Sequence, residues 1–459
     1  MCVGRACFVG RGPLPEPRSP NTLLLGADHL WRIRRDQLRF YADMRARHGD
    51  RVRLRLGPYR SWLLFRPDDV ERVLVASAAS FIRFRKLTEV IAQWNGDSLI
   101  VAEGQRWRDR RRKVQPAFRT QRVRDYAATA ASHAERLCTR FERAGRPEGV
   151  TVDTDAVMAR LTLDIATGTL FGAEPLANGD EVERAIQVLS DTAFHESTAP
   201  FVMPDWLPLP SKARKRRAMA LMDHVVGDLV RRRIIDEPGD RGDLLSMLVE
   251  QHGGEHIPVR DDAMSLLIAG HETSGALLSW LFLALVQYPA WRARVIGEVA
   301  AFGDRPPGVD DVAALPLLRA VIAEVLRLWP PAYSLFLRQA TEDVDLGDTM
   351  IRGGDLVQIV PFTLHRDPRW FDEPNSFDPD RFLRPPSWPA HAYLPFGSGP
   401  RVCIGQNFAL VEACVVAATI LQRWEPVAVP AVPEPDPKFS LRPRGGLPMT
   451  WRRVEISRA

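Results

Sequence analysis

The stretch FGSGPRVCIG, Phe396 to Gly405, places a cysteine in a loop with three glycines, a proline and an arginine. The apolar pattern from Gln406 to Trp424 predicts a helix, so Cys403 lies just before a helix start. Backbone N–H groups there stabilise a thiolate and are expected to lower the pKa of Cys403. Gly397 and Gly399 allow backbone conformations that other residues rarely adopt. The loop therefore predicts an exposed thiolate.

Two neighbours of Cys403 indicate what that thiolate binds. Gly405 lets a flat partner lie close to the helix backbone, and Arg401 can pair with an anionic group. An exposed thiolate beside glycines and an arginine suits an axial ligand of haem iron, with Arg401 on a haem propionate. From this loop alone, a buried cysteine in a tight turn is the alternative.

The composition is that of an ordinary soluble globular protein, with 45% apolar and 26% charged residues among 459. The net charge of +5 comes from bases spread along the chain, which argues against nucleic-acid binding. Five scattered cysteines do not form a disulfide framework and indicate a reducing, cytoplasmic location. The first residues contain no apolar run long enough for a signal peptide, and we expect no transmembrane anchor.

The periodic segments predict a mainly helical protein with small β-sheets. Residues 1–22 are rich in glycine, proline and arginine and are expected to be loose. Arg51 to Pro67 alternates apolar and polar residues around Gly-Pro, which predicts a β-hairpin. Helical patterns dominate from Gln105 to Ala300, and short strands and turns follow from Arg338 to Leu383 and after Glu425.

One apolar segment, Ala263 to Ala290, has the length of a membrane span and a single formal charge, Glu272. Amphipathic segments flank it, and several polar residues lie near its centre. A long core helix is therefore the prediction, with a membrane span as the alternative.

The chain resembles the cytochromes P450, whose signature F-x-x-G-x-R-x-C-x-G is matched at every defining position by Phe396, Gly399, Arg401, Cys403 and Gly405. The resemblance runs from about Leu23 to Trp451. It implies the cytochrome P450 fold, one haem domain over residues 23–459, haem b as the cofactor and Cys403 as the iron ligand. The residues in and around these motifs are similar to those of fatty-acid-type and microsomal-type members, but the hydrophobic anchor of microsomal members is not expected here. The resemblance therefore implies a soluble bacterial enzyme of secondary metabolism.

A second motif lies in AVIAEVLRLWPP, where Glu324 and Arg327 stand three residues apart on one helix face and can pair. Their helix is otherwise apolar, so a buried pair needs further partners. Arg381 in FDPDRF is the predicted third member. The three resemble the family's Glu-x-x-Arg plus Arg cluster, which supports the fold beneath the haem.

The segment AGHETS, Ala269 to Ser274, resembles the oxygen-activating part of the family's central helix. The resemblance implies that Thr273 bonds a backbone carbonyl and dioxygen, and that Glu272 feeds protons through water. Ala269 is expected against the haem, and Gly270 leaves room for oxygen. His271 is interpreted as a helix-packing residue. The alternative for the whole segment is a group of polar residues in a core helix that are hydrogen-bonded within the protein and have no catalytic role.

Trp107 and Arg111 lie four residues apart on one helix face in WRDRRRKVQPAF. The resemblance implies that both bond a haem propionate, with Arg338 as a second clamp from another strand. The other bases of this segment are read either as a solvated face or as a docking patch for an acidic electron-transfer protein: Arg108, Arg110, Arg112 and Lys113.

Together these features imply a monomeric monooxygenase that uses O2 and two electrons to oxidise a lipophilic molecule. The electrons are expected from a separate ferredoxin or flavodoxin with its NAD(P)H reductase, because no flavin or iron–sulfur domain follows the cysteine loop. A peroxide-driven hydroxylase and a non-catalytic haem-thiolate sensor are the alternatives. The pair Glu272-Thr273 argues against peroxide use.

The substrate pocket is expected to be apolar and to suit a terpenoid, a fatty acyl chain or a polyketide-like molecule. The family's recognition regions predict as its lining residues 81–95 together with Phe194, Ala269, Ser334, Leu335, Phe336 and Leu447. The basic run Lys212 to Arg217 lies in the expected lid region. It is interpreted as a solvated face, with a membrane-surface contact as the alternative.

Overall fold

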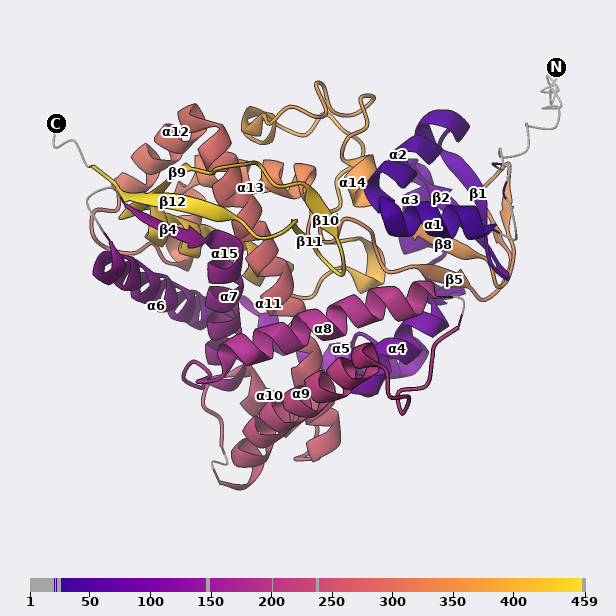
Figure 1. Cartoon of the computed structure of the whole chain (residues 1–459), viewed down its shortest axis with the longest axis horizontal. Coiled ribbons are helices and arrows are strands. Elements are labelled where there is room, and N and C mark those ends of the chain that lie inside the picture. The colour runs from indigo at the N-terminus through magenta and orange to yellow at the C-terminus, as the bar shows by residue number, and fades with distance from the viewer. Residues whose placement is uncertain are drawn as a thin grey trace, which may run out of the picture.

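The computed structural model describes residues 20, 22, 26–145, 149–199, 201–236 and 239–455. It is mainly helical with small sheets, which confirms the predicted fold class. Figure 1 shows the first strands at one side of the molecule, the last strands at the other, and the long helix α11 between them. The predicted loose segment 1–22 lies outside the described residues, apart from positions 20 and 22.

Long core helices are joined by loops and by much shorter helices. Those that the structure describes are α1 (Ala27–Arg35), α2 (Gln37–His48), α3 (Pro67–Glu71), α4 (Arg85–Asn95), α5 (Gly104–Val114), α6 (Thr120–Ala144), α7 (Thr154–Phe171), α8 (Gly179–Thr198), α9 (Pro210–Ile235), α10 (Leu244–Gln251), α11 (His256–Gln287), α12 (Pro289–Ala300), α13 (Pro316–Leu328), α14 (Pro361–Leu364) and α15 (Gln406–Leu421). Helix α3 continues as a π-helical turn over Arg72–Ala76.

The strands are short and form several small sheets. They are β1 (Arg51–Leu56), β2 (Tyr59–Leu64), β3 (Phe81–Arg83), β4 (Val150–Asp153), β5 (Arg338–Ala340), β6 (Val344–Asp345), β7 (Met350–Ile351), β8 (Leu356–Ile359), β9 (Trp424–Ala428), β10 (Pro435–Pro437), β11 (Leu441–Pro443) and β12 (Pro448–Arg453). The hairpin predicted around Gly57-Pro58 is confirmed, because Leu56 pairs with Tyr59 across it.

The largest sheet brings distant segments to one place. Its strand order is β1-β2-β8-β5-β3, so strands from the start of the chain lie beside strands that follow α13. Strand β3 pairs antiparallel with β5, and Arg83 lies directly opposite Arg338. Like charges opposite each other in a sheet are destabilising unless something neutralises them. This register therefore marks a place where an anion is needed.

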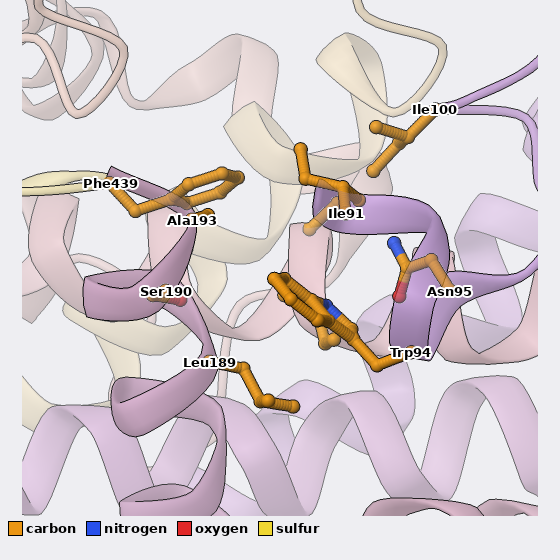
Figure 2. Close-up of a pocket in the computed structure, with 10 residues that line it drawn as sticks. Ile91, Trp94, Asn95, Ile100, Leu189, Ser190, Ala193 and Phe439 are labelled. Atoms are coloured by element: carbon orange, nitrogen blue, oxygen red, sulfur yellow. The ribbon is translucent and has the colours of Figure 1, made fainter. Parts of the chain in front are cut away.

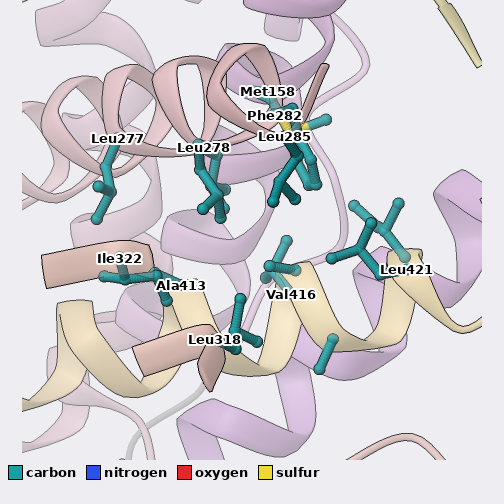
Figure 3. Close-up of a cluster of buried hydrophobic side chains, with 14 of the residues drawn as sticks. Met158, Leu277, Leu278, Phe282, Leu285, Leu318, Ile322, Ala413, Val416 and Leu421 are labelled. Carbon is teal, nitrogen blue, oxygen red and sulfur yellow. The ribbon is translucent and has the colours of Figure 1, made fainter. Parts of the chain in front are cut away.

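Helix α11 is the core helix that the apolar segment predicted. Among the described residues it is the one helix long and apolar enough to cross a membrane, and 83% of its most apolar window is buried inside the protein. A helix that is apolar on all sides must be covered on all sides. Figure 3 shows how α7, α13 and α15 cover it, with Met158, Leu278, Ile322 and Val416 among the packed side chains.

The predicted ion pair on α13 is present and fully buried. Arg327 donates from Nε to Glu324 Oε2 at 2.7 Å and from Nη2 to Oε1 at 2.8 Å. Its other hydrogen bonds go to three backbone carbonyl oxygens, those of His365, Pro374 and Ser376. A guanidinium has five N–H donors, so all of them are satisfied. Arg381 completes the cluster by donating from Nε to Glu324 Oε1 at 3.2 Å.

The same helix holds the segment that leads into the cysteine loop. The backbone N–H of Leu394 donates to His365 Nε2 at 2.9 Å, and Tyr393 donates its hydroxyl hydrogen bond to the Ala323 carbonyl at 2.9 Å. Burial and the charge of Arg327 lower the pKa of His365 to about 3, so its ring is neutral and can accept. Helix α13 therefore positions the residues just before Phe396.

A second buried acid lies between the two central helices. Ser274 on α11 donates from Oγ to Glu412 Oε2 on α15 at 2.8 Å. Glu412 is 2% exposed, and burial raises its pKa from 4.5 to about 8. The folded protein therefore holds a proton on Glu412 that the unfolded chain releases above about pH 4.5. The stability that this proton contributes is complete below that pH and is lost as the pH rises toward 8.

Glu412→Gln is expected to flatten this pH dependence. Glutamine keeps an oxygen that accepts from Ser274 but carries no titratable proton, whereas wild type loses about 1.4 kcal/mol per pH unit between the two pKa values. Thermal unfolding of both proteins from about pH 5 to 8 measures the difference. Glu434→Gln, at an exposed side chain, is the matched control. Parallel curves for wild type and Glu412→Gln would contradict the assignment.

Candidate active site

The cysteine loop, residues 396–405, folds back on itself before α15. The backbone N–H of Cys403 donates to the Phe396 carbonyl at 3.0 Å, and that of Val402 donates to the Gly399 carbonyl at 3.0 Å. Gly397 and Gly399 both have φ of 73°, in the left-handed region that favours glycine. Gly405 is the N-cap of α15, which begins at Gln406 as predicted.

Gly399 has a further reason to be glycine. A Cβ on this residue would lie 1.8 Å from the Leu74 carbonyl oxygen, in the π-helical turn after α3. A Cβ on Gly397 would meet nothing closer than Leu335 Cδ2 at 3.9 Å. Of the two, Gly399 is therefore the one that allows the close approach that seats the loop against the N-terminal part of the chain.

The Cys403 thiol is accessible although protein surrounds it. Its residue is exposed, yet burial raises the pKa of the thiol above 9.0, while the Gly405 amide and the charge of Arg111 act in the opposite direction. A side chain that is accessible and at the same time surrounded by protein atoms faces an internal space and not the outer surface. The expected net lowering of the pKa by the helix start is wrong, because desolvation outweighs the backbone dipoles in this loop.

Four arginines gather close to this loop. Arg83 and Arg338 face each other on β3 and β5, Arg111 comes from α5, and Arg401 comes from the loop. Burial and then the charges of Arg401, Arg338 and Arg111 lower the pKa of Arg83, against the opposing effect of Glu103. Burial is also the main cause that lowers the pKa of Arg401 to about 10.

One carboxylate, that of Glu103, serves this arginine cluster. Glu103 accepts from Arg401 Nη2 and from the Arg83 backbone N–H, the latter at 3.1 Å. Burial lowers the pKa of Arg111 and of Arg338, and no hydrogen bond from a described residue offsets it. The buried Nε of Arg83 has no partner among the described residues. The cluster therefore has unused donors and excess positive charge.

Trp107 lies within the same group. The Arg401 guanidinium carbon is 4.4 Å from the centroid of the Trp107 ring, and that of Arg111 is 5.8 Å from it. Contacts of this kind stabilise a cation over an aromatic face. Trp107 thus holds two of the arginines together, one from its own helix and one from the cysteine loop.

One turn of α11, from Ala269 to Thr273, borders a large cavity. Thr273 donates from Oγ1 to the Ala269 carbonyl at 2.8 Å, one turn earlier on the helix. A Cβ on Gly270 would meet nothing within 4 Å, so space is open beside the helix there. Ala269 and Thr273 both line the cavity, whose volume is about 560 Å³.

The family model for cytochrome P450 matches residues 17–448. The chain belongs to the cytochrome P450 family. Two proteins of Streptomyces melanosporofaciens are each 34% identical to it: cyclooctatin synthase, over 90% of this chain and 91% of that protein, and cyclooctat-9-en-7-ol 5-monooxygenase, over 93% and 92%. Pentalenene oxygenase of Streptomyces avermitilis is 29% identical over 88% of this chain and 89% of its own.

Among solved structures, the cytochrome P450 CYP175A1 from Thermus thermophilus superposes with a TM-score of 0.75 at 26% identity. The match covers 94% of this chain and 99% of that one. The protein is therefore an oxidoreductase of the monooxygenase type, and its family implies a haem-iron cofactor.

The residues near Cys403 fit a haem. A thiolate is a known axial ligand of haem iron, and a bound metal ion deprotonates a coordinating thiol outright. The arginine cluster offers unused guanidinium donors, which suit the carboxylates of haem propionates. Arg83 belongs to this cluster although sequence reasoning treated its segment only as pocket lining. No local pattern in Phe81–Arg83 could have found it, because its place opposite Arg338 comes from the pairing of β3 with β5.

Glu272 is not at the surface of the large cavity. Its Oε2 accepts from Ser190 Oγ at 2.7 Å and its Oε1 accepts from Ser440 Oγ at 2.9 Å. Burial raises its pKa, while Ser190 and then Arg442 act in the opposite direction. The acid is thus held between α8 and the β10–β11 hairpin, next in sequence to Thr273.

His271 packs between helices, as interpreted from the sequence. Its Nδ1 lies 3.2 Å from Thr162 Oγ1 on α7. Burial and the charge of Arg442 lower its pKa to about 3, so the ring is neutral.

Most of the predicted pocket residues line the large cavity. The cavity walls include Phe194, Ala269, Ser334, Leu335 and Phe336. Leu447 does not belong to them: it is fully buried in the main core, where its backbone bonds Asp153 and Thr154. The wall on that side is Phe439, at the turn of the β10–β11 hairpin. Sequence reasoning assigned this wall to a segment that follows the hairpin.

The basic run Lys212 to Arg217 is only partly solvated. Lys212 is 5% exposed and Lys215 is 1% exposed. Both pair with Glu196 and Asp205, Lys212 at 2.5 and 2.7 Å, Lys215 at 2.9 and 2.8 Å. The interpretation as a solvated face is wrong for these two lysines. They join α9 to the end of α8 and to the segment between the two helices.

The bases on α5 also divide into two groups. Arg110 pairs with the buried Asp262 on α11 at 2.9 Å, so it belongs to the interior of the fold. Arg108 is exposed and bonds Gln105, while Arg112 pairs with Asp109 at 3.5 Å. Arg108 and Arg112 are the exposed members of this group and lie on the solvent side of α5.

Replacing the two loop glycines tests the close approach to Leu74. Gly399→Ala combines a left-handed φ with a clash against the Leu74 carbonyl and is expected to destabilise the protein by about 3–5 kcal/mol. Gly397→Ala, the matched control, has the same φ and free space, so about 1–2 kcal/mol is expected. Thermal unfolding measures both. Equal losses for the two variants would contradict the close approach.

Proposed function

We propose that this cytochrome P450 uses O2 and two electrons from a separate redox partner to oxidise a terpenoid or a similarly lipophilic molecule. The observation that carries the proposal is the cavity of about 560 Å³ that reaches Ala269 and Thr273 on α11. Its walls are mostly apolar, with Phe84, Phe194, Phe336 and Phe439 among them. Such a cavity suits a compact apolar substrate with few polar groups.

The names of similar bacterial proteins support the same substrate class. Cyclooctat-9-en-7-ol 5-monooxygenase and pentalenene oxygenase are named for the oxidation of terpenoids. We extend this class to the present chain because its cavity has the size and apolar character that such molecules need. Fatty acyl chains and polyketide-like molecules are the other members of the proposed lipophilic group.

We assign the cofactor as haem b, with Cys403 as the axial thiolate. When bound, this group supplies the activation of oxygen, which no side chain of the protein performs. Phe396 and Gly405 in the loop, and Ala269 on α11, would border this group. The propionates are assigned to the arginine cluster around Trp107. The unused donors of Arg111 and Arg338 and the excess positive charge support this assignment.

The proton path is assigned to Thr273 and Glu272. The Thr273 hydroxyl donates to the Ala269 carbonyl, and its lone pairs are free to accept from a water in the cavity. Glu272 is buried with a raised pKa and is hydrogen-bonded to two serines, which suits a group that holds and releases a proton. The pair also argues against a peroxide-driven hydroxylase.

Electrons are assigned to a ferredoxin or flavodoxin with its NAD(P)H reductase, acting on a monomer in the cytoplasm. The exposed arginines on the outer face of α5, with Arg106 and Arg112 each more than two thirds exposed, suit an acidic partner. Turnover with a surrogate ferredoxin and reductase tests the function. Product with peroxide alone would favour the peroxide-driven alternative, and a ligand-induced spectral shift without product would favour a sensor.

Cys403→Ser is expected to abolish the carbon-monoxide difference band typical of haem-thiolate proteins, because a hydroxyl does not replace the thiolate ligand. Difference spectra of the reduced protein measure it. Cys414→Ala is the control, since Cys414 is a buried core residue whose thiol pKa is raised to about 12. A band that survives in Cys403→Ser would remove the ligand assignment.

Thr273→Ala is expected to uncouple NAD(P)H consumption from product formation and to increase peroxide release severalfold. The reason is that the hydroxyl bonded to Ala269 is the polar group of α11 that reaches the cavity. Peroxide formed per NAD(P)H consumed is the measurement, and Thr273→Ser is the control that keeps the hydroxyl. Coupling that is unchanged in the alanine variant would exclude Thr273 from the proton path.

A further inference from the structure

Residues 201–209, between α8 and α9, expose several large apolar side chains to solvent. Phe201 is 71% exposed and Trp206 is 77% exposed, and Met203 and Leu209 are also exposed. Figure 1 shows this segment at the outer edge of the molecule. An exposed apolar side chain is ordinary when it stands alone, but four within nine residues form a patch, and such patches mark interaction sites.

The start of α9 holds this segment in place. Asp205 pairs with Lys212 at 2.7 Å and with Lys215 at 2.8 Å. Arg216 donates to the two backbone carbonyls that flank Trp206. The backbone on both sides of Trp206 is therefore fixed to α9, and the indole is presented to solvent by a defined structure.

Helix α8, which leads into the segment, is packed against the interior. Figure 2 shows Leu189 on α8 opposite Trp94 on α4, in the apolar space between the two helices. Both side chains belong to one buried cluster. Val202 packs against the same cluster, whereas its neighbours Phe201 and Met203 are exposed. The alternation shows that the segment uses one side for the core and turns the other outward.

The exposed segment lies beside an opening of the large cavity. Ala199, just before it, lines that cavity together with Ala27 of α1, which is exposed, so the cavity reaches the outer surface there. Lys86 donates to the Ala199 carbonyl, and its pKa is lowered by burial and then by the charge of Arg34 on α1. Helix α1 therefore lies across the opening from the exposed segment.

Helix α1 carries a further exposed tryptophan. Trp31 is 59% exposed, and the guanidinium carbon of Arg35 lies 5.2 Å from the centroid of its ring. Tryptophan is favoured where an apolar phase meets water, because its ring is apolar and its N–H is polar. The exposed apolar side chains on the two sides of the opening are called here the apolar rim: Trp31, Phe201, Met203, Trp206 and Leu209.

The charges beside the apolar rim are positive. Lys212 and Lys215 face inward, whereas Arg214 and Arg217, three residues apart on the other side of α9, are exposed. Neither arginine has a hydrogen bond or an ion pair with any residue that the structure describes. The single acid of residues 201–209, Asp205, is already paired with the two lysines. The surface next to the rim therefore carries positive charge that only an outside anion can neutralise.

We propose that the apolar rim and the exposed arginines of α9 bind the surface of a membrane that contains anionic lipids. Aromatic side chains enter the boundary between headgroups and acyl chains, and arginines reach the lipid phosphates. In this position the opening of the cavity faces lipid, so a lipophilic substrate enters without crossing water. That consequence rests on the proposed function, whereas the membrane contact itself does not.

A lipid surface fits the apolar rim better than a protein partner does. The rim has five apolar side chains, whereas a stable protein interface takes about 20–30 residues from each partner. Pro204, Pro208 and Pro210 keep the segment from pairing as a strand with another chain. A membrane surface needs no matched backbone edge, only apolar side chains and basic charge.

Binding of the haem-loaded protein to vesicles tests the proposal. Vesicles of phosphatidylcholine are compared with vesicles of phosphatidylcholine and phosphatidylglycerol in equal amounts, and bound protein is measured by co-sedimentation. Wild type is expected to bind the mixed vesicles at least about tenfold more tightly, since each arginine near an anionic surface raises the affinity about fivefold. High salt is expected to reduce this difference, because it screens exposed charges.

Trp206→Ser and Phe201→Ser are each expected to weaken binding to the mixed vesicles about tenfold, because an apolar side chain no longer leaves water. Ile257→Ser is the matched control: Ile257 is 71% exposed, as Phe201 is, but lies at the start of α11. All three variants are expected to keep the melting temperature of wild type, since the side chains are exposed.

Arg214→Gln combined with Arg217→Gln is expected to remove most of the preference for the anionic vesicles. Arg453→Gln is the control, at an exposed arginine of β12, which Figure 1 shows on the side of the molecule away from α1. Trp206→Phe is expected to keep binding, since it keeps an apolar ring, but to reduce the quenching of tryptophan fluorescence by brominated phosphatidylcholine in the mixed vesicles.

Three results would overturn the inference. They are no binding of wild type to the mixed vesicles, losses in Trp206→Ser and Phe201→Ser no larger than in Ile257→Ser, and self-association of wild type that Trp206→Ser abolishes, which would assign the rim to a second copy of the chain. In each case, turnover in solution with the surrogate redox system leaves the proposed monooxygenase function in place. Vesicle binding without turnover of any lipophilic compound would support the inference and count against that function.

Discussion

The buried pair of Glu324 and Arg327 is the interaction on which the site depends. Every donor of Arg327 is used, and three of its bonds go to carbonyls between His365 and Ser376, far along the chain. Removing one partner of such a pair leaves an uncompensated charge in the core, at a cost of about 3–5 kcal/mol. It also releases the segment that leads to the cysteine loop. An ion pair between two residues of α13 thus positions Cys403 by bonding the backbone of a distant segment that leads to the cysteine loop.

The central helix α11 shows how an apolar core can carry chemistry. Its buried polar side chains near the cavity each find a partner on another element or on the helix itself: His271 with Thr162, Glu272 with Ser190 and Ser440, Thr273 with Ala269, and Ser274 with Glu412. Polar groups held in this way keep a defined geometry in a low-dielectric interior.

The burial of a side chain depends on which distant segments meet around it, and this explains why the sequence placed several residues wrongly. Lys212 and Lys215 read as solvated because their run is basic, but Glu196 and Asp205 come to them from α8 and the segment after it. Leu447 was assigned to the pocket, whereas the β10–β11 hairpin brings Phe439 there. The pKa of Cys403 rises because the loop is enclosed, which no spacing within the loop records.

The sequence by itself determined the features that local geometry governs. They are the glycine conformations and helix start around Cys403, the Glu324–Arg327 pair on one helix face, the hairpin at Gly57-Pro58 and the apolar helix that became α11. Only the tertiary structure decided which side chains from separate elements share a space. It brought Arg83 opposite Arg338 and held Glu272 between two serines. The reason is that short-range backbone and side-chain geometry is encoded in neighbouring residues, whereas desolvation and charge pairing depend on contacts between segments far apart in the chain.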